Sequence, residues 1–217
     1  MLGNFDLHLH SRYSFDGLMS PQYIVRLAKK RGLSGIAITD HNTIAGGAEA
    51  FASNNDKDIL VIVGTEIYTE IGDILGLFLS REIKSRRSED VVDEIHSQGG
   101  WVVLPHPYHH HKEIPVELLR KIDAVEIFNG RTGADYSQKA IHDISIPYNL
   151  GIVGNSDAHL PWEIGRVYNS IEIESFNTIS VFDSLINKRC KPVTAKPGRS
   201  ASAVYISKFI KRLRRFI

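Results

Sequence analysis

The chain has 217 residues, a net charge of +1 and 42% hydrophobic content, which suffices for one sizeable core and makes a single domain the default. Its only cysteine, Cys190, excludes an internal disulfide framework and a zinc site built from cysteines. Neither a signal-peptide pattern nor an apolar run of membrane-spanning length is present, so we expect a soluble, cytoplasmic protein.

Five apolar runs each end in residues that commonly bind metals. They occupy residues 5–10, 35–41, 60–66, 101–106 and 151–159. Continuous apolar runs of this length are typical of strands buried on both faces, and a repeated strand-then-ligand layout places the polar atoms at one end of a parallel sheet or barrel. α/β folds have their active sites at that end. Imidazoles and carboxylates that meet there without a thiolate suit several divalent cations, and we therefore predict a metal-dependent hydrolase.

Helix-like segments alternate with these runs as far as about residue 187. One begins at Ser20-Pro21, and a second begins near Ser88. Strands that alternate with helices predict βαβ units. Residues 73–79 interrupt the alternation, and we expect an additional strand there.

His8 and His10 lie two residues apart in the first run, so in a strand both side chains face one side and can bind one metal together. Asp6 falls on the same face. A buried carboxylate beside a metal-bound imidazole can accept its second N–H, and we predict this orienting role for Asp6. The alternative is a strand whose polar residues face solvent.

Together these motifs resemble, in the same order, those of the PHP (polymerase and histidinol phosphatase) domain family. Residues 6–17 resemble its first motif, residues 32–43 its second, and residues 64–66, 104–107 and 154–159 its later ones. The resemblance implies an α/β fold, a distorted (β/α)7 barrel similar to the TIM barrel, which we assign to residues 1–187. It also implies up to three metal ions, such as manganese, zinc or iron, at the carboxyl ends of the strands.

The resemblance implies nine metal ligands, all imidazoles or carboxylates: His8, His10, Asp16, His41, Glu66, Asp73, His106, Asp157 and His159. The first metal would take His8, His10, Glu66 and Asp157. Glu66 would bridge to a second metal, which His106 also binds. The third metal would take Asp16, His41 and His159. Related phosphoesterases carry a histidine at the position of Asp73. Two interpretations of Asp73 stay open, as a ligand of the second metal or as a residue that only begins a strand.

Three arginines occupy loop positions from which a guanidinium can bind phosphate through two hydrogen bonds: Arg12, Arg131 and Arg166. We predict that all three bind substrate and that Arg131, Arg166 and Asp40 have catalytic roles. Ordinary surface arginines would fit the same positions. Glu126 and Asn129 lie where related proteins often carry a metal or substrate contact.

The implied reaction is hydrolysis of a phosphate ester of a nucleotide, an oligonucleotide or a small metabolite, with a slight preference for the first two. We expect in-line attack by a hydroxide that bridges two metals, without a covalent intermediate. Two alternatives stay open. One is a non-catalytic, metal-stabilised PHP-like module for regulation or interaction. The other is an amidohydrolase-type hydrolase, which shares the His-x-His pair but commonly relies on a modified lysine where Glu66 stands here.

The end of the chain is a basic tail. Of the 26 basic residues ten lie in residues 188–217, where there is no acidic one, which leaves 16 basic against 25 acidic side chains over residues 1–187. Apolar residues three or four apart predict an amphipathic cationic helix: Ile206, Phe209, Ile210, Leu213 and Ile217. We expect this helix to dock on the barrel, because an apolar helical stripe usually belongs to a core. Contact with nucleic acid or a membrane is the alternative.

Overall fold

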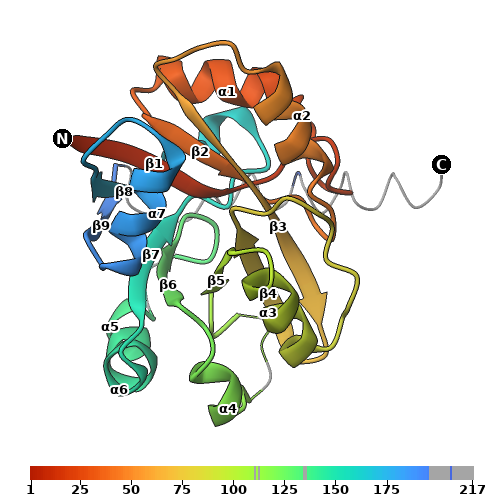
Figure 1. Cartoon of the computed structure of the whole chain (residues 1–217), viewed down its shortest axis with the longest axis vertical. Helices are drawn as coiled ribbons and strands as arrows, with labels where there is room; N and C mark the ends of the chain where they lie inside the picture. Colours follow the sequence, from red (N-terminus) through yellow and green to blue (C-terminus); the bar gives the residue numbers. More distant parts are fainter. Residues whose placement is uncertain (110, 112, 134–135, 196–205, 207–217) are drawn as a thin grey trace.

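A nine-stranded sheet in the order β7-β6-β5-β4-β3-β2-β1-β8-β9 forms the centre of the protein (Figure 1). The computed structural model describes residues 1–109, 111, 113–133, 136–195 and 206. The strands are β1 (Leu2–Leu9), β2 (Gly35–Ile38), β3 (Leu60–Thr69), β4 (Gly72–Leu77), β5 (Trp101–Leu104), β6 (Ala124–Asn129), β7 (Gly151–Asn155), β8 (Val167–Glu172) and β9 (Cys190–Thr194). Residues of β7 at one edge contact β8 and β9 at the other, so the sheet is a nearly closed barrel.

The strands β1, β2, β3, β5, β6, β7 and β9 run in one direction, and β4 and β8 run against them. The additional strand predicted at residues 73–79 is β4. Only Glu70 and Ile71 separate it from β3, and a parallel partner would need a crossover of a dozen residues or more. The predicted barrel is therefore confirmed, with two reversed strands in place of a fully parallel sheet.

The helices are α1 (Pro21–Lys30), α2 (Ala45–Ser53), α3 (Ser88–His96), α4 (Val116–Leu119), α5 (Ser137–Ala140), α6 (Ile146–Tyr148) and α7 (Thr178–Ile186), and they lie around the outside of the sheet (Figure 1). The predicted start of α1 is confirmed, since the Ser20 hydroxyl accepts the N–H of Tyr23 at 3.3 Å and Pro21 is the first helical residue. Ser88 begins α3 without capping it. Its N–H donates instead to Glu70 Oε2 at 2.9 Å.

Buried apolar side chains lie both inside the barrel and between its outer face and the helices. Phe5, Leu75 and Val103 belong to a cluster that also takes in Val181 and Leu185 of α7. Two further clusters pack α1 and α2 against β1 to β3, and α3 to α5 against β3 to β6. Apolar residues on both faces explain why these strands read as continuous apolar runs in the sequence.

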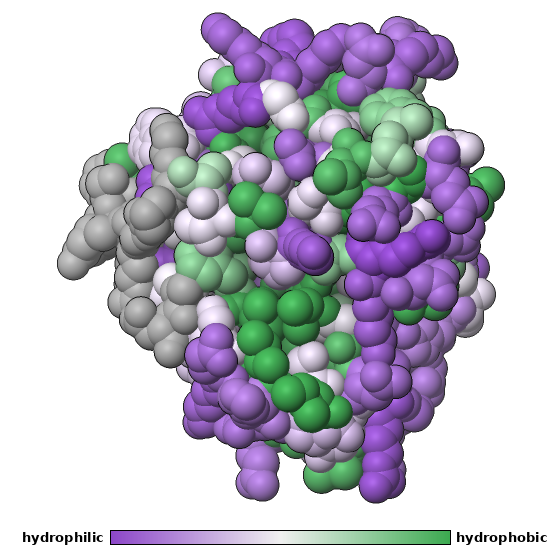
Figure 2. Space-filling view, turned by 90° about the vertical axis from the view of Figure 1, so that its left-hand side faces the viewer, coloured by the Kyte–Doolittle hydropathy of each residue, from purple (hydrophilic) through white to green (hydrophobic). Residues whose placement is uncertain are grey.

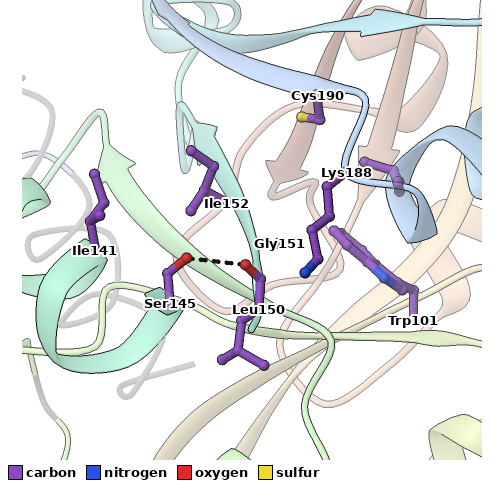
Figure 3. Close-up of a pocket in the computed structure, with 9 residues that line it drawn as sticks. Trp101, Ile141, Ser145, Leu150, Gly151, Ile152, Lys188 and Cys190 are labelled. Carbon is purple, nitrogen blue, oxygen red and sulfur yellow. Dashed lines mark hydrogen bonds between the residues drawn. The ribbon is translucent and has the colours of Figure 1, made fainter. Parts of the chain in front are cut away.

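A cavity of about 270 Å³ lies at the starts of β5, β7 and β9, where it is lined by Trp101, Gly151 and Cys190 (Figure 3). Because these strands run in parallel, their starts lie at the end of the barrel opposite to the predicted ligands. An apolar area bordered by hydrophilic side chains is visible on the side that carries α7 and β9 (Figure 2). In the described part of the chain, no helix combines the length and the apolar character that crossing a bilayer requires.

The sheet extends past the predicted boundary at residue 187. β9 pairs antiparallel with β8 and so takes residues 190–194 into the barrel. The amphipathic helix predicted over residues 206–217 lies, apart from Ile206, outside the described residues. Its docking on the barrel, on nucleic acid or on a membrane stays a prediction.

Candidate metal centre

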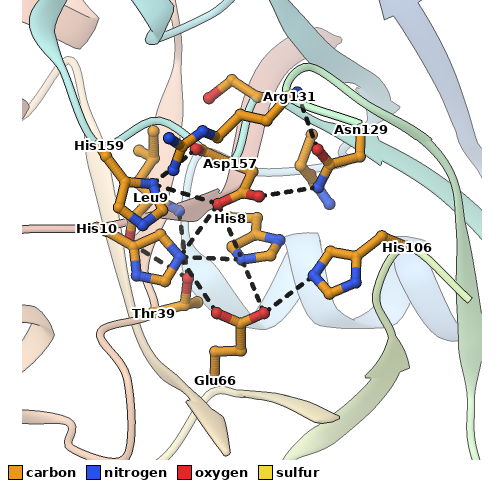
Figure 4. A network of polar contacts seen from close by, with 12 residues as sticks. His8, Leu9, His10, Thr39, Glu66, His106, Asn129, Arg131, Asp157 and His159 are labelled. Carbon is orange, nitrogen blue, oxygen red and sulfur yellow. Dashed lines mark hydrogen bonds and ion pairs between the residues drawn. The ribbon is translucent and has the colours of Figure 1, made fainter. Parts of the chain in front are cut away.

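The nine predicted ligands meet at one end of the barrel, in or after the last residues of β1, β2, β3, β5 and β7 and at the start of β4. Figure 4 shows His8, His10, Glu66, His106, Asp157 and His159 among them. Two of these strand ends have unusual backbone geometry. His106 has a φ of 29° and Asp157 a φ of 52°, in a region that non-glycine residues seldom occupy. Strained backbone of this kind concentrates at functional sites, because the surrounding structure must hold it in place.

Glu66 is at the centre of the cluster and uses its two carboxylate oxygens for different neighbours. Oε1 lies 3.5 Å from His8 Nε2 and 3.1 Å from His106 Nε2. Oε2 lies 3.4 Å from His10 Nε2 and 2.9 Å from His41 Nδ1. A carboxylate whose oxygens face two separate pairs of imidazoles has the geometry that bridging two cations requires.

Two aspartates connect His10 and His41 to a further imidazole, that of His159. Asp157 Oδ1 lies 3.3 Å from His10 Nε2 and 3.4 Å from His159 Nδ1. Asp16 Oδ1 lies 3.5 Å from His41 Nε2 and 3.2 Å from His159 Nε2. The structure therefore brings Asp16, His41 and His159 together, as the sequence predicted for a third metal.

The donor atoms form three groups, and within each group all the atoms lie within 4.8 Å of one another. The groups are His8, His10 and Glu66; His10, His41 and His159; and Glu66, Asp73 and His106. Asp73 is thus beside the ligands predicted for the second metal. Asp16 Oδ1 and His159 Nε2 are buried 3.2 Å apart, yet within the described part of the chain neither atom makes a hydrogen bond. Buried polar atoms without a hydrogen bond, in a set of imidazoles and carboxylates without thiols, fit divalent transition metals.

The second ring nitrogen of four histidines is held by an acceptor, which decides where the ring proton lies in the neutral imidazole. His8 Nδ1 lies 3.3 Å from Glu126 Oε1, and His106 Nδ1 lies 3.3 Å from the carbonyl oxygen of His109. His159 Nδ1 lies 3.0 Å from the carbonyl oxygen of Asp157. In the neutral imidazole each of these Nδ1 atoms would carry the hydrogen, and each Nε2 would present its lone pair to the cluster.

His10 reaches the same tautomer through Ser14. The Ser14 hydroxyl donates its only hydrogen to Asp40 Oδ1 at 2.7 Å. It must therefore accept a hydrogen from His10 Nδ1, which lies 3.0 Å away. Asp40 also accepts hydrogen bonds from the N–H and the hydroxyl of Ser11 at 2.6 and 2.7 Å. In this structure Asp40 thus acts on the cluster through Ser14, and its predicted catalytic role stays a prediction.

Charges within the cluster shift the pKa values of its members. Burial disfavours the imidazolium of His41, but the carboxylates of Glu66 and Asp16 outweigh it and raise the pKa to about 10. Burial and the neighbouring imidazoles of His159 and His41 lower the pKa of His10 to about 3. Burial and the charge of Glu66 raise the pKa of Asp73 to about 7. Divalent cations would compete with protons for these same atoms.

The carboxylate that orients His8 is Glu126 of β6, and the prediction that Asp6 does so is wrong. The register of β1 shifts between Asp6 and Leu9, so strict alternation fails there. Asp6 Oδ1 accepts the N–H of Ser156 at 3.1 Å, and Oδ2 accepts that of Gly165 at 2.9 Å. Burial raises the pKa of Asp6 to about 6. Asp6 thus holds two loops of the site instead.

Glu126 accepts four hydrogen bonds, although it is completely buried. Oε1 faces His8 Nδ1 at 3.3 Å and the amide of Asn155 at 2.8 Å. Oε2 accepts the N–H of His106 at 3.0 Å and the amide of Asn129 at 2.9 Å. A carboxylate in the middle of the apolar run at residues 124–128 is the sequence signal that pointed to this position.

The three predicted arginines have different surroundings. Arg131, with a side chain 10% exposed, places Nε 3.5 Å from Glu163 Oε1 at the edge of the cluster. Arg166 directly precedes β8. Because β8 runs antiparallel to β1, the start of β8 lies at the same end of the barrel as the cluster. Arg12 donates to both carboxylate oxygens of Glu49, at 3.1 and 3.2 Å, and its side chain is 51% exposed. Substrate binding by these residues stays a prediction.

Comparison with known proteins agrees with this geometry. A family model described as the PHP domain matches residues 6–213. An uncharacterized protein of Methanocaldococcus jannaschii is 39% identical over 140 residues, which cover 57% of this chain and 80% of that protein.

Two solved structures share the fold. One is a two-domain protein from Bacteroides vulgatus described as containing a predicted PHP-like metal-dependent phosphoesterase, with a TM-score of 0.76 and 24% identity over 89% of this chain and 65% of that one. The other is endonuclease Q in complex with a 27-mer duplex that has an abasic lesion at the active site, with a TM-score of 0.70 and 16% identity over 95% of this chain and 67% of that one. Because the family model matches nearly the whole sequence, the chain belongs to the PHP domain family.

Proposed function

We propose that this protein is a metal-dependent phosphoesterase. The observation that carries the proposal is the arrangement of four histidines around one pocket. An acceptor lies against Nδ1 of His8, His10, His106 and His159, and the Nε2 atoms of all four face a buried, carboxylate-lined pocket, into which the neutral rings would present their lone pairs. Histidines arranged only for packing have no reason to present their lone pairs together beside anionic carboxylates, whereas metal ligands must do so.

The three groups of donor atoms, together with the contacts of Asp157 and Asp16, support the ligand assignment that the family resemblance implies. The first ion would take His8, His10, Glu66 and Asp157, and the second would take Glu66, Asp73 and His106. The third would take Asp16, His41 and His159. Bound divalent cations would lower the pKa of a coordinated water and neutralise phosphoryl oxygens, which is the chemistry that hydrolysis of a phosphate ester requires.

The protein's own residues would bind and orient the phosphate. Arg131 is the arginine best placed for this role, because its guanidinium lies at the edge of the cluster near Asp157 and His159 (Figure 4). Its planar array of N–H donors matches the oxygens of a phosphoryl group. Arg166 would bind a more distant part of the substrate, since the start of β8 lies at the same end of the barrel as the cluster.

We further propose a nucleotide or short oligonucleotide as the substrate. Exposed aromatic side chains follow three of the ligand-bearing segments: Tyr68 at the end of β3, Tyr108 after β5 and Trp162 after β7. The ring of Tyr68 already stacks on that of His41, with centroids 4.8 Å apart. Aromatic rings beside a catalytic pocket give nucleobases a surface to stack on. Endonuclease Q, which shares the fold, is an endonuclease whose structure holds a 27-mer duplex substrate.

The test is turnover of three model substrates by protein loaded with manganese: an aryl phosphate, an aryl ester and a cyclic amide. We expect hydrolysis of the phosphate, its loss after chelation of the metal, and its recovery when manganese is restored. Preference for the ester or the amide would favour an amidohydrolase-type enzyme. No turnover of any of them, nor of dinucleotides and nucleotide phosphates, would favour a non-catalytic module.

A further inference from the structure

Glu163 is a fully buried carboxylate beside the cluster. It ends the short turn Pro161–Glu163, a few residues after the ligand His159. Its Oε2 accepts the backbone N–H groups of His159 and Leu160, both at 3.0 Å. Its Oε1 lies 3.5 Å from Arg131 Nε. One carboxylate thus joins the loop that carries a metal ligand to an arginine that comes from the end of a different strand.

Arg131 belongs to the loop after β6, where its backbone N–H donates to Asn129 Oδ1 at 2.9 Å. This contact fixes the backbone, and the long side chain has several rotatable bonds of its own. An arginine in such a position binds phosphate well only if its guanidinium is already held in one orientation. Otherwise the loss of side-chain conformational entropy on binding weakens the affinity for substrate. Glu163 is the anionic group that faces its Nε.

We propose that Glu163 is a positioning residue, which holds the Arg131 guanidinium in the orientation that meets the phosphoryl oxygens of the substrate. The inference rests on the proposed function, since it assumes that a phosphate group enters this pocket. It assigns Glu163 a part in substrate affinity beyond its contacts with the loop at His159 and Leu160. Arg131 and Glu163 then act as one unit, and removing either member removes the same phosphate contact.

Glu163→Gln separates the two roles of this side chain. The amide oxygen of glutamine can still accept the N–H groups of His159 and Leu160, so the loop keeps its hydrogen bonds. The NH₂ group of the amide would then face Arg131 Nε–H, and two donors cannot pair. The substitution therefore disturbs the arginine and spares the loop.

Glu94 also holds backbone but uses both of its oxygens, since Oε2 accepts the N–H of Lys84 at 2.8 Å and Oε1 accepts that of Ser85 at 3.0 Å. It belongs to α3, on the outside of the barrel. Glu94→Gln makes the same chemical change at a place that faces no arginine of the cluster. The amide NH₂ group would then face one of the two backbone N–H groups, so the fall in the melting temperature of Glu94→Gln shows what losing a backbone contact costs.

The experiment measures KM and kcat for an aryl phosphate, the inhibition constant of inorganic phosphate, the metal content and the melting temperature. For Glu163→Gln we expect KM and the inhibition constant to rise about tenfold, the effect of losing one charge-assisted hydrogen bond. We expect kcat to change less, the metal content to match that of the wild type and of Glu94→Gln, and the melting temperature to fall less than in Glu94→Gln. Arg131→Met should raise both constants, and the double variant should be no worse than Arg131→Met.

An unchanged inhibition constant in Glu163→Gln would overturn the inference. Additive effects in the double variant, or a loss of metal that accounts for the change, would overturn it as well. If the wild-type protein hydrolyses no phosphate ester, the proposed function fails by itself. Calorimetric titration of the wild type, Glu163→Gln, Arg131→Met and the double variant with inorganic phosphate then still decides whether Glu163 and Arg131 form one phosphate-binding unit.

Discussion

Glu66→Gln is expected to lower kcat for a phosphate ester by about 10³-fold or more. The carboxylate contacts His8 and His106 through one oxygen and His10 and His41 through the other. A neutral amide keeps the volume but removes the charge that lets two cations approach each other. Loss of one ion forfeits several kcal/mol of charge stabilisation, and about 1.4 kcal/mol corresponds to tenfold in rate.

The measurement is kcat together with metal content for Glu66→Gln and for Glu94→Gln, whose carboxylate lies on α3 away from the cluster. Both proteins should fold, and only Glu66→Gln should lose metal and turnover together. A Glu66→Gln protein that keeps more than a tenth of the wild-type rate would show that Glu66 does not bridge.

Glu126→Gln is expected to weaken metal binding or activity by about 10- to 100-fold and also to lower stability. Four donors converge on the two oxygens of this carboxylate, from His8, His106, Asn129 and Asn155. An amide can accept at only one oxygen, so two buried donors would face an NH₂ group. Each buried donor left without an acceptor costs about 1–3 kcal/mol.

The measurement pairs metal titration with thermal unfolding and uses Glu172→Gln as the control, because Glu172 is an exposed strand residue. The control should behave like the wild type in both. Normal metal affinity in Glu126→Gln would contradict the orienting role of Glu126, and His8 would then need another partner.

Most of the predicted ligands could be located from the sequence because they lie near the carboxyl end of a strand, some just inside it and others after it. His8, His10, Glu66 and Asp157 occur at the ends of apolar runs, and parallel strands bring such ends together whatever the details of the loops. The extra strand β4 was also predictable, since its apolar residues follow β3 without room for a helix. The local sequence pattern is therefore enough to predict both the positions of these ligands and the strand β4.

The partners of the ligands could not be predicted in the same way. His8 and Glu126 are 118 residues apart, and their contact depends on the irregular register of β1. Nothing in the local pattern distinguishes the correct partner from Asp6, which simple alternation favours. Long-range register decides which carboxylate reaches an imidazole.

α2 gave no clear helical pattern either, because Gly46 and Gly47 are poor helix formers. Close packing explains Gly46, since a Cβ there would lie 2.0 Å from Asp40 Oδ2. The same helix carries Glu49, which binds Arg12. The pairing of Arg12 therefore depended on a helix that the sequence pattern did not reveal.

Metal content of the purified protein, measured by inductively coupled plasma mass spectrometry, tests the central claim most directly. Protein purified without chelator should carry about two to three divalent transition-metal ions per chain, and Glu66→Gln should carry fewer. Wild-type protein that holds no stoichiometric metal, even after incubation with manganese, zinc or iron, would contradict the account.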